Sequence, residues 1–196
     1  MEKIAFKPYA CGTMLQPFID CAISLAREGL DYRDITHVLC NVGEGTVHRL
    51  WEPSSEKKHP TTPYSAKFSG PFCVAVGLVD RAAGLNQFTE AKISDPDILA
   101  LTEKVEYRID PEDEYPRNYS GHVRATVKDG SVRETLQPHL RGGVREPLDR
   151  NELVDKFRAN LTFGGISQKH AGEIEDALSG LFDAPDMSPL AACRLE

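Results

Sequence analysis

Two short segments of the sequence combine residue types that can bind an organic anion. The first, KPYACGT at residues 7–13, places a lysine, a turn of small residues and a hydroxyl directly before a predicted helix. Free backbone N–H groups and the dipole make a helix N-terminus attractive to anions, and Lys7 would add a full positive charge. An exposed lysine followed by an ordinary helix N-cap explains the same residues without a ligand, so both interpretations stay open.

The second segment, AKFSGPF at residues 66–72, repeats this order of residue types. Lys67 and Ser69 precede a helix that we predict over residues 69–85 and that is apolar nearly all round, which is typical of a buried helix. Anion binding at a partly buried helix end is strengthened by the low local dielectric. The alternative is that Ser69 only caps the helix and Lys67 faces solvent. If the two helix starts converge, they would suit a ligand with more than one carboxylate.

Composition and charge exclude several classes of protein. Lys and Arg total 23 against 30 Asp and Glu, so the 196-residue chain has a net charge of −7 and is a poor candidate for binding nucleic acid or an anionic membrane. Five cysteines without C-x-x-C spacing predict neither a disulfide framework nor a structural zinc site. We expect a reduced, cytoplasmic protein without a bound metal, because no signal peptide or membrane-length apolar run is visible. The common nucleotide, zinc-protease and serine-hydrolase motifs are also missing.

Hydrophobic periodicity predicts the elements that would position these residues. Two β-branched runs, 35–42 and 46–51, flank a glycine-rich turn and predict a β-hairpin, and Asp129-Gly130 predicts a second hairpin between residues 121–127 and 131–136. An Asp149-x-x-Glu152 capping box opens a helix. The remaining predictions are a strand at 105–109, helices at 17–30, 95–105 and 167–182, and a loop at 52–64.

The order of these elements predicts an α+β fold. Helices interleave with antiparallel-type strands without repeated βαβ units, which favours a two-layer α/β sandwich with an antiparallel sheet. We expect this domain over residues 1–145, C-terminal helices over 146–183, and a flexible tail over 184–196.

Taken in order, these segments resemble the C-terminal domain of the MmgE/PrpD family. This family includes 2-methylcitrate dehydratases, cis-aconitate decarboxylases and iminodisuccinate epimerases. The resemblance extends from Phe6 to about Phe163, and its order and spacing are more specific than any one motif. It is carried by FKPYACGTMLQPFID, AKFSGPFCVAVGL, the Asp95–Val105 stretch, ATVKDGSV and RGGVREPLDRNELVDKFR.

The resemblance implies proton removal beside a carboxylate of a small polycarboxylic acid, followed by loss of water, loss of carbon dioxide or inversion. It implies no iron–sulfur cluster and no other cofactor. Lys7 matches the family's active-site lysine, with the role of clamping a carboxylate and stabilising developing negative charge. The resemblance also implies that the turn lining the pocket is Cys11, Gly12 and Thr13, and that Lys67 and Ser69 lie at the edge of the site.

Two substitutions depart from the family pattern. Family members usually carry histidine where this chain has Gln16, and often tyrosine where it has Phe72. Glutamine can donate a hydrogen bond but does not titrate near neutral pH, and phenylalanine lacks the hydroxyl. We therefore predict Gln16 and Phe72 as substrate-binding positions whose chemistry differs from that of the family.

The resemblance further implies a helical partner. In the family an all-helical domain precedes this region and completes the site, and the lysine motif of this chain lies close to Met1. We therefore expect the C-terminal half of a metal-independent lyase, similar to 2-methylcitrate dehydratase, that needs a helical N-terminal domain or subunit and forms a homo-oligomer, commonly a dimer. The 69–85 helix would pack toward that helical part. The alternatives are an isomerase or epimerase, a non-catalytic polycarboxylate-binding module, or a truncated product.

Overall fold

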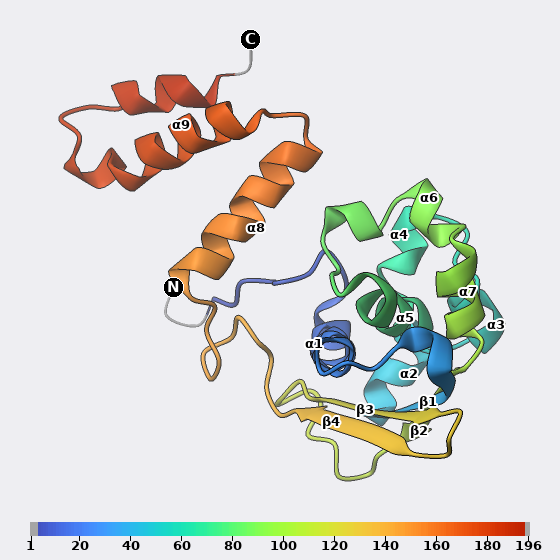
Figure 1. Ribbon diagram of the computed structural model, residues 1–196. Helices are drawn as coiled ribbons and strands as arrows, with labels where there is room; N and C mark the ends of the chain where they lie inside the picture. The colour runs from blue at the N-terminus through green and yellow to red at the C-terminus, as the bar shows by residue number, and fades with distance from the viewer. Residues whose placement is uncertain (1–3, 195–196) are drawn as a thin grey trace. The chain divides into compact units, whose positions relative to one another are not determined.

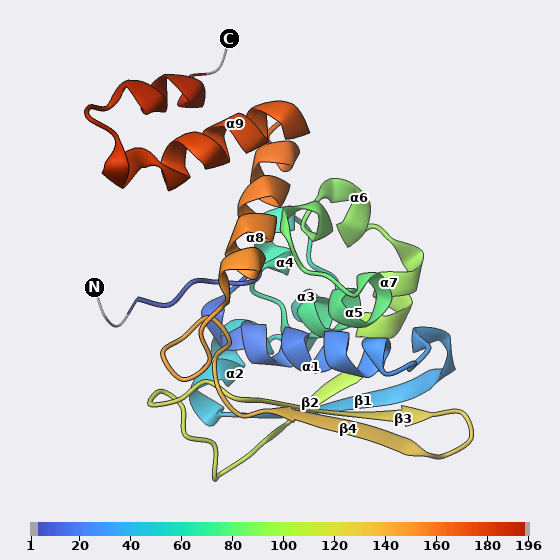
Figure 2. The same ribbon diagram turned by 60° about the vertical axis from the view of Figure 1, so that its left-hand side comes forward.

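A four-stranded sheet with helices on one face builds the first part of the chain (Figure 1). The computed structural model describes residues 4–194. The chain divides after Leu148 into two compact units, which are described separately. Both figures show α1 (Gln16–Arg27) and α5 (Gly70–Asp80) on the same side of the sheet (Figure 2).

The sheet is mixed, so the prediction of a purely antiparallel sheet is wrong. Its strand order is β2-β1-β3-β4, in which β1 (Ile35–Val42) pairs in parallel with β2 (Val105–Ile109) and antiparallel with β3 (Gly121–Val127). A parallel pair needs a long crossover, and here residues 43–104 provide one that is largely helical. The predicted second hairpin is confirmed: β3 pairs with β4 (Val132–Gln137), and Gly130 in its turn has a φ of +83°.

The predicted strand at residues 46–51 is wrong, because this stretch is helical. It forms the 3₁₀ turn Glu44–Thr46 and then α2 (Val47–Leu50). Thr46, Leu50 and Trp51 are its buried side chains, and their spacing fits one helical turn rather than the alternation of a strand. The amide of Trp51 accordingly donates to the Val47 carbonyl at 2.9 Å.

The crossover contains further short helices. The stretch predicted as a loop holds α3 (Ser54–Lys58) and leads into α4 (Pro63–Ala66), whose capping box is formed by Thr62 and Ser65. The predicted helix at 95–105 is shorter, α7 (Pro96–Thr102), and follows α6 (Glu90–Ile93). Single 3₁₀ turns lie at Thr13–Leu15, Tyr32–Asp34 and Leu85–Gln87.

Helices α1 and α5 pack closely together over the sheet. The buried position predicted for α5 is confirmed: its residues from Gly70 to Leu78 are all buried. The helix ends earlier than predicted, at Asp80, because Arg81 adopts a left-handed conformation with a φ of 56°. At Gly77 an added Cβ would lie only 2.8 Å from the Cβ of Ala22, so the missing side chain permits the close approach of the two helices.

The second unit is helical. It contains α8 (Arg150–Phe163), α9 (Gln168–Ser179) and the 3₁₀ segments Leu181–Asp183 and Ser188–Cys193. The predicted capping box of Asp149 and Glu152 is confirmed. An ion pair of 2.7 Å between Arg158 and Glu175 joins α8 to α9. No helix among residues 4–194 has the length and apolar character required to cross a membrane.

Replacing Gly77 by alanine should force α1 and α5 apart. We expect the free energy of unfolding to fall by about 1–3 kcal/mol, because an extra methyl group in a packed core is accommodated only by strain. Urea denaturation followed by circular dichroism measures the effect. Gly172→Ala in α9 is the control: nothing lies within 4 Å of its added Cβ, so a gain of about 0.5–1 kcal/mol is expected there. Equal effects at the two glycines would contradict the packing.

The cysteines should differ sharply in reactivity. All five are free, and only Cys193 is exposed. Burial raises the pKa of Cys21 to about 12 and also raises the pKa of Cys40 and Cys73, which keeps these thiols protonated. Iodoacetamide at pH 8 should therefore modify Cys193 first, with one label per native chain and five in denaturant by mass spectrometry. Rapid labelling of Cys40 in the native protein would be incompatible with its burial.

Candidate functional site

Lys7 lies on residues 6–12, a segment without regular secondary structure that we call the strap. Backbone hydrogen bonds of 2.9–3.0 Å fix the strap at both ends and in the middle. Its donors are the amides of Phe6, Ala10 and Gly12, and the respective acceptors are the carbonyls of Gly142, Ala83 and Lys67. The strap is therefore held to three separate parts of the first unit.

A triad of polar side chains adds a further attachment next to Lys7. The hydroxyl of Tyr9 donates to the carboxylate of Asp20 on α1 at 2.6 Å. Arg141, which follows β4, donates through Nε to the same carboxylate oxygen at 2.8 Å and through Nη2 to the Tyr9 hydroxyl at 2.9 Å. The Asp20 side chain is only 9% exposed, and burial is the main reason why the pKa values of Asp20 and Tyr9 are raised.

The strap places the two lysine-bearing segments side by side. The hydrogen bond of 2.9 Å from Gly12 to Lys67 joins them, and the Phe68 ring lies 3.4 Å from where a Gly12 Cβ would be. Lys7 is exposed, and its ammonium group lies 3.3 Å from the carbonyl oxygen of Cys11. Lys67 is half-buried, and its ammonium group has no hydrogen-bond or ion-pair partner among residues 4–194. The segments that carry the two lysines thus meet at one backbone contact.

The start of α5 is closed by its own structural contacts. Ser69 is buried, accepts a hydrogen bond of 3.0 Å from the Phe72 amide and donates its hydroxyl proton to the Lys57 carbonyl. Phe72 is also buried, with its ring 6.0 Å from that of Phe88. The Trp51 ring covers Gly70. Ser69 and Phe72 therefore lie beneath the surface near Lys67, where their side chains serve packing and capping.

The other predicted residues lie around the start of α1. Cys11 and Gly12 are buried, and Thr13 is half-buried in the 3₁₀ turn that precedes the helix. Gln16 is the first residue of α1 and is 0% exposed, yet neither atom of its amide group has a hydrogen-bond partner in the described chain. A buried amide without hydrogen bonds lowers the stability of the fold, so Gln16 is a polar group whose hydrogen-bonding capacity is unused.

Sequence reasoning missed a second group of cations beside this contact. The guanidinium of Arg49, on α2, lies over the Phe68 ring with its carbon 5.5 Å from the ring centroid. The Lys57 ammonium donates to the carbonyls of Arg49 and Phe68 at 2.6 and 3.0 Å. Desolvation lowers the pKa of Lys57; the charge of Glu56 opposes this shift, and the charge of Arg49 adds to it. No sequence spacing signals this group, because its members lie on separate elements.

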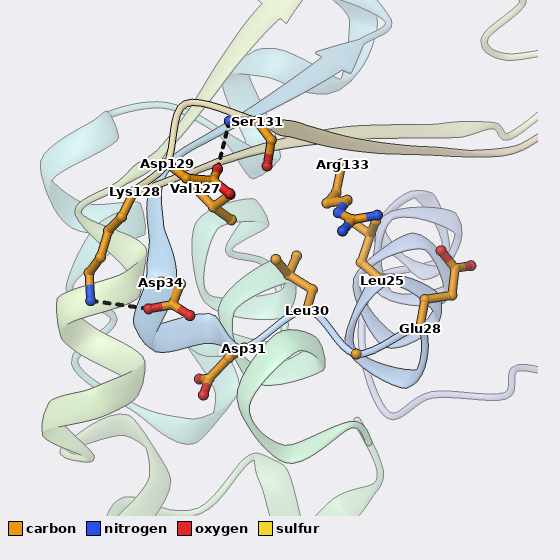
Figure 3. Close-up of a pocket in the computed structure, with 11 residues that line it drawn as sticks. Leu25, Glu28, Leu30, Asp31, Asp34, Val127, Lys128, Asp129, Ser131 and Arg133 are labelled. Atoms are coloured by element: carbon orange, nitrogen blue, oxygen red, sulfur yellow. Dashed lines mark hydrogen bonds and ion pairs between the residues drawn. The ribbon is translucent and has the colours of Figure 1, made fainter.

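A cavity of about 390 Å³ lies away from these residues, between the end of α1 and the β3–β4 hairpin (Figure 3). Leu25, Leu30 and Val127 give it an apolar lining, and an ion pair of 3.2 Å between Lys128 and Asp34 stands at its rim. No residue predicted for the site lines this cavity. Within the part of the chain that the structure describes, no three His, Cys, Asp or Glu side chains are grouped to hold a metal ion.

Removing the Tyr9 hydroxyl should weaken the attachment of the strap. We expect Tyr9→Phe to lower the free energy of unfolding by about 1–3 kcal/mol, because the buried Asp20 carboxylate loses a donor. The matched control is Tyr32→Phe, which removes an exposed tyrosine–carboxylate bond of 2.7 Å to Asp97 and should cost under about 1 kcal/mol. Thermal and urea unfolding measure both variants. A Tyr9→Phe protein as stable as the wild type would contradict the role of this bond.

Comparison with known proteins identifies the family of this chain. The MmgE/PrpD C-terminal domain matches residues 9–180. A cis-aconitate decarboxylase of Aspergillus terreus is 30% identical over 148 residues, which cover 73% of this chain and 29% of that protein. A second one, from A. terreus strain NIH 2624, is 28% identical over 199 residues, covering 95% and 39% respectively. The cis-aconitate decarboxylase of Homo sapiens is 28% identical over 104 residues, covering 53% and 22%.

The matches cover between 53% and 95% of this chain but no more than 39% of these relatives. The chain spans about a third of the length of the two Aspergillus proteins. The family match, in contrast, runs from Tyr9 in the strap through the loop that carries Arg141 and into the second unit as far as Gly180, and it leaves Lys7 outside. The chain belongs to the MmgE/PrpD family, and the part of that family present in it is the C-terminal domain.

Proposed function

We propose that this chain supplies the C-terminal half of a lyase that acts on a small polycarboxylic acid. The observation that carries the proposal is the hydrogen bond from Gly12 to Lys67, which holds the segments of Lys7 and Lys67 together. In a chain with a net charge of −7, this pairing makes a local site for anions against the overall field. Family membership and relatives named cis-aconitate decarboxylase support a lyase acting on such acids.

The reaction would use these cations to stabilise negative charge. When a carboxylate leaves as carbon dioxide, or a proton is lost beside a carboxylate before water leaves, an electron pair remains on carbon and spreads into the neighbouring group. Fixed ammonium groups favour that transition state over the ground state. Lys7 would clamp one carboxylate and Lys67 a second. The names of the relatives favour loss of carbon dioxide. Loss of water or inversion would also begin with negative charge developing on a carbon beside a carboxylate.

We further propose that a helical domain or subunit completes the site. The buried Gln16 amide cannot exchange a proton near neutral pH, and we propose that a group supplied by that domain or subunit moves the proton. The second unit supports the proposal of a partner, because no residue of α8 is buried. Leu153, Phe157 and Leu178 line an apolar cavity of about 490 Å³ between α8 and α9. An additional helix would cover these side chains, and we expect the assembled protein to form a homodimer.

A second candidate function is polycarboxylate binding without turnover. The amide of Gln16 favours it, since this residue stands where the resemblance places a titratable histidine. The two functions differ in one measurable respect, because a binding module would retain the Lys7-dependent affinity while releasing no product.

Substitution of Lys7 should separate these functions. The assembled protein that contains this chain is incubated with cis-aconitate or 2-methylcitrate, and products are followed by proton NMR and release of carbon dioxide. We expect Lys7→Ala to lower kcat/KM by about 100-fold or more, because a charge that stabilises the transition state is lost. Lys128→Ala removes a lysine already paired with Asp34 and should leave kcat/KM unchanged.

The possible results are distinct. Turnover that depends on Lys7 but not on Lys128 supports the lyase. Binding of both acids without any product supports the binding module. Neither turnover nor binding by the assembled protein contradicts the proposed anion site altogether.

A further inference from the structure

Arg49 is a cation beside the Gly12–Lys67 contact for which the proposed reaction has given no role. Its guanidinium lies over the ring of Phe68, and that ring also packs against Gly12. Lys67 immediately precedes Phe68 in the chain. One aromatic ring therefore adjoins Arg49, Gly12 and the backbone of Lys67.

The backbone around Arg49 is held in place by a half-buried lysine. Lys57 donates to the carbonyls of Arg49 and Phe68, which ties the end of α2 to the segment before α5. The Lys57 carbonyl in turn accepts the hydroxyl proton of Ser69, the N-cap of α5. These bonds fix the distance between α2 and the Lys67 segment, and Arg49 is thereby presented at a defined place.

The charge of Arg49 is not neutralised within residues 4–194. No carboxylate forms an ion pair with its guanidinium, and the nearby cation Lys57 adds positive charge that Glu56 offsets in part. Arg33 provides the contrast: it too lies over an aromatic ring, at 5.7 Å from Tyr32, but Asp31 neutralises it at 2.8 Å. A cation–π contact leaves the N–H donors of a guanidinium available, and these match a carboxylate in a bidentate manner.

We propose that Arg49 is a third anion-binding residue of this site and binds the carboxylate of a polycarboxylic acid that Lys7 and Lys67 leave free. This inference rests on the proposed function, because it assumes that the two lysines bind the other carboxylates. Arg49 then determines specificity: it favours acids with three carboxylates over acids with two. The side chain holds one end of the ligand and takes no part in proton transfer.

Two acids that differ by one carboxylate test this role. Tricarballylate is glutarate with an added central carboxylate, so the ratio of their dissociation constants reports the third contact. Titration calorimetry on the assembled protein that contains the full chain gives both values. We expect Arg49→Ala to raise the Kd for tricarballylate by about 10-fold, as for loss of a charge-assisted hydrogen bond, and the Kd for glutarate by less than about 2-fold.

Three variants serve as controls. Arg33→Ala removes a guanidinium of the same kind at a remote place and should leave both dissociation constants unchanged. Arg49→Lys keeps the charge but loses the bidentate geometry, so its Kd for tricarballylate should lie between those of the wild type and Arg49→Ala. Lys7→Ala should weaken the binding of both acids. Thermal unfolding of each variant shows whether its fold is retained.

The outcomes separate this inference from the proposed function. Suppose that Lys7→Ala weakens the binding of both acids, while Arg49→Ala weakens the binding of both equally or of neither. The proposed role of Arg49 is then wrong, and the anion site stands. If neither acid binds to the wild-type assembly, or if Lys7→Ala leaves both affinities unchanged, the proposed site itself is wrong and the inference falls with it. A selective loss of tricarballylate affinity in a folded Arg49→Ala protein supports both.

Discussion

The position of Lys7 depends on the buried carboxylate of Asp20. Residues 6–12 have no helix or strand to provide regular hydrogen bonds, and three backbone hydrogen bonds hold the strap to the rest of the first unit. Asp20 adds a side-chain constraint by accepting hydrogen bonds from Tyr9 and Arg141, which tie the strap to α1 and to the loop after β4. Burial of this charge is costly, and the cost is offset only while both donors remain in place. The triad therefore converts an irregular segment into a defined support for an ammonium group.

A second constraint concentrates positive charge in an acidic chain. The Lys57 ammonium group donates hydrogen bonds to two backbone carbonyls, those of Arg49 and Phe68. These bonds order the backbone around both residues. Lys67 and Arg49 keep their charges free of carboxylate partners among the described residues, whereas Lys128 and Arg33 elsewhere on the first unit are paired with aspartates. Other exposed arginines of the first unit, such as Arg27 and Arg81, are also without a carboxylate partner among the described residues, so what marks Arg49 and Lys67 is their common contact through Phe68 and Gly12.

Local signals in the sequence predicted much of the fold, whereas contacts between residues distant in the sequence were missed. The Asp129-Gly130 turn and the Asp149–Glu152 capping box act over a few residues, and both predictions are confirmed. The parallel pairing of β1 with β2 was missed because it depends on how the whole 43–104 crossover folds. The site follows the same division. Adjacent residues such as Lys7 and Cys11 were identified as a group, whereas residues 9, 20 and 141 converge only in the folded chain.

The parallel strand pair has a kinetic consequence. Residues 43–104 bear Arg49, Lys57 and Lys67, and they lie within the loop that is closed when β1 meets β2. Closing so long a loop costs chain entropy before any favourable contact is made, and contacts between residues distant in sequence form slowly. The β3–β4 hairpin, in contrast, can assemble early from neighbouring residues. The cationic surface is therefore a late product of folding, formed only after the crossover has closed.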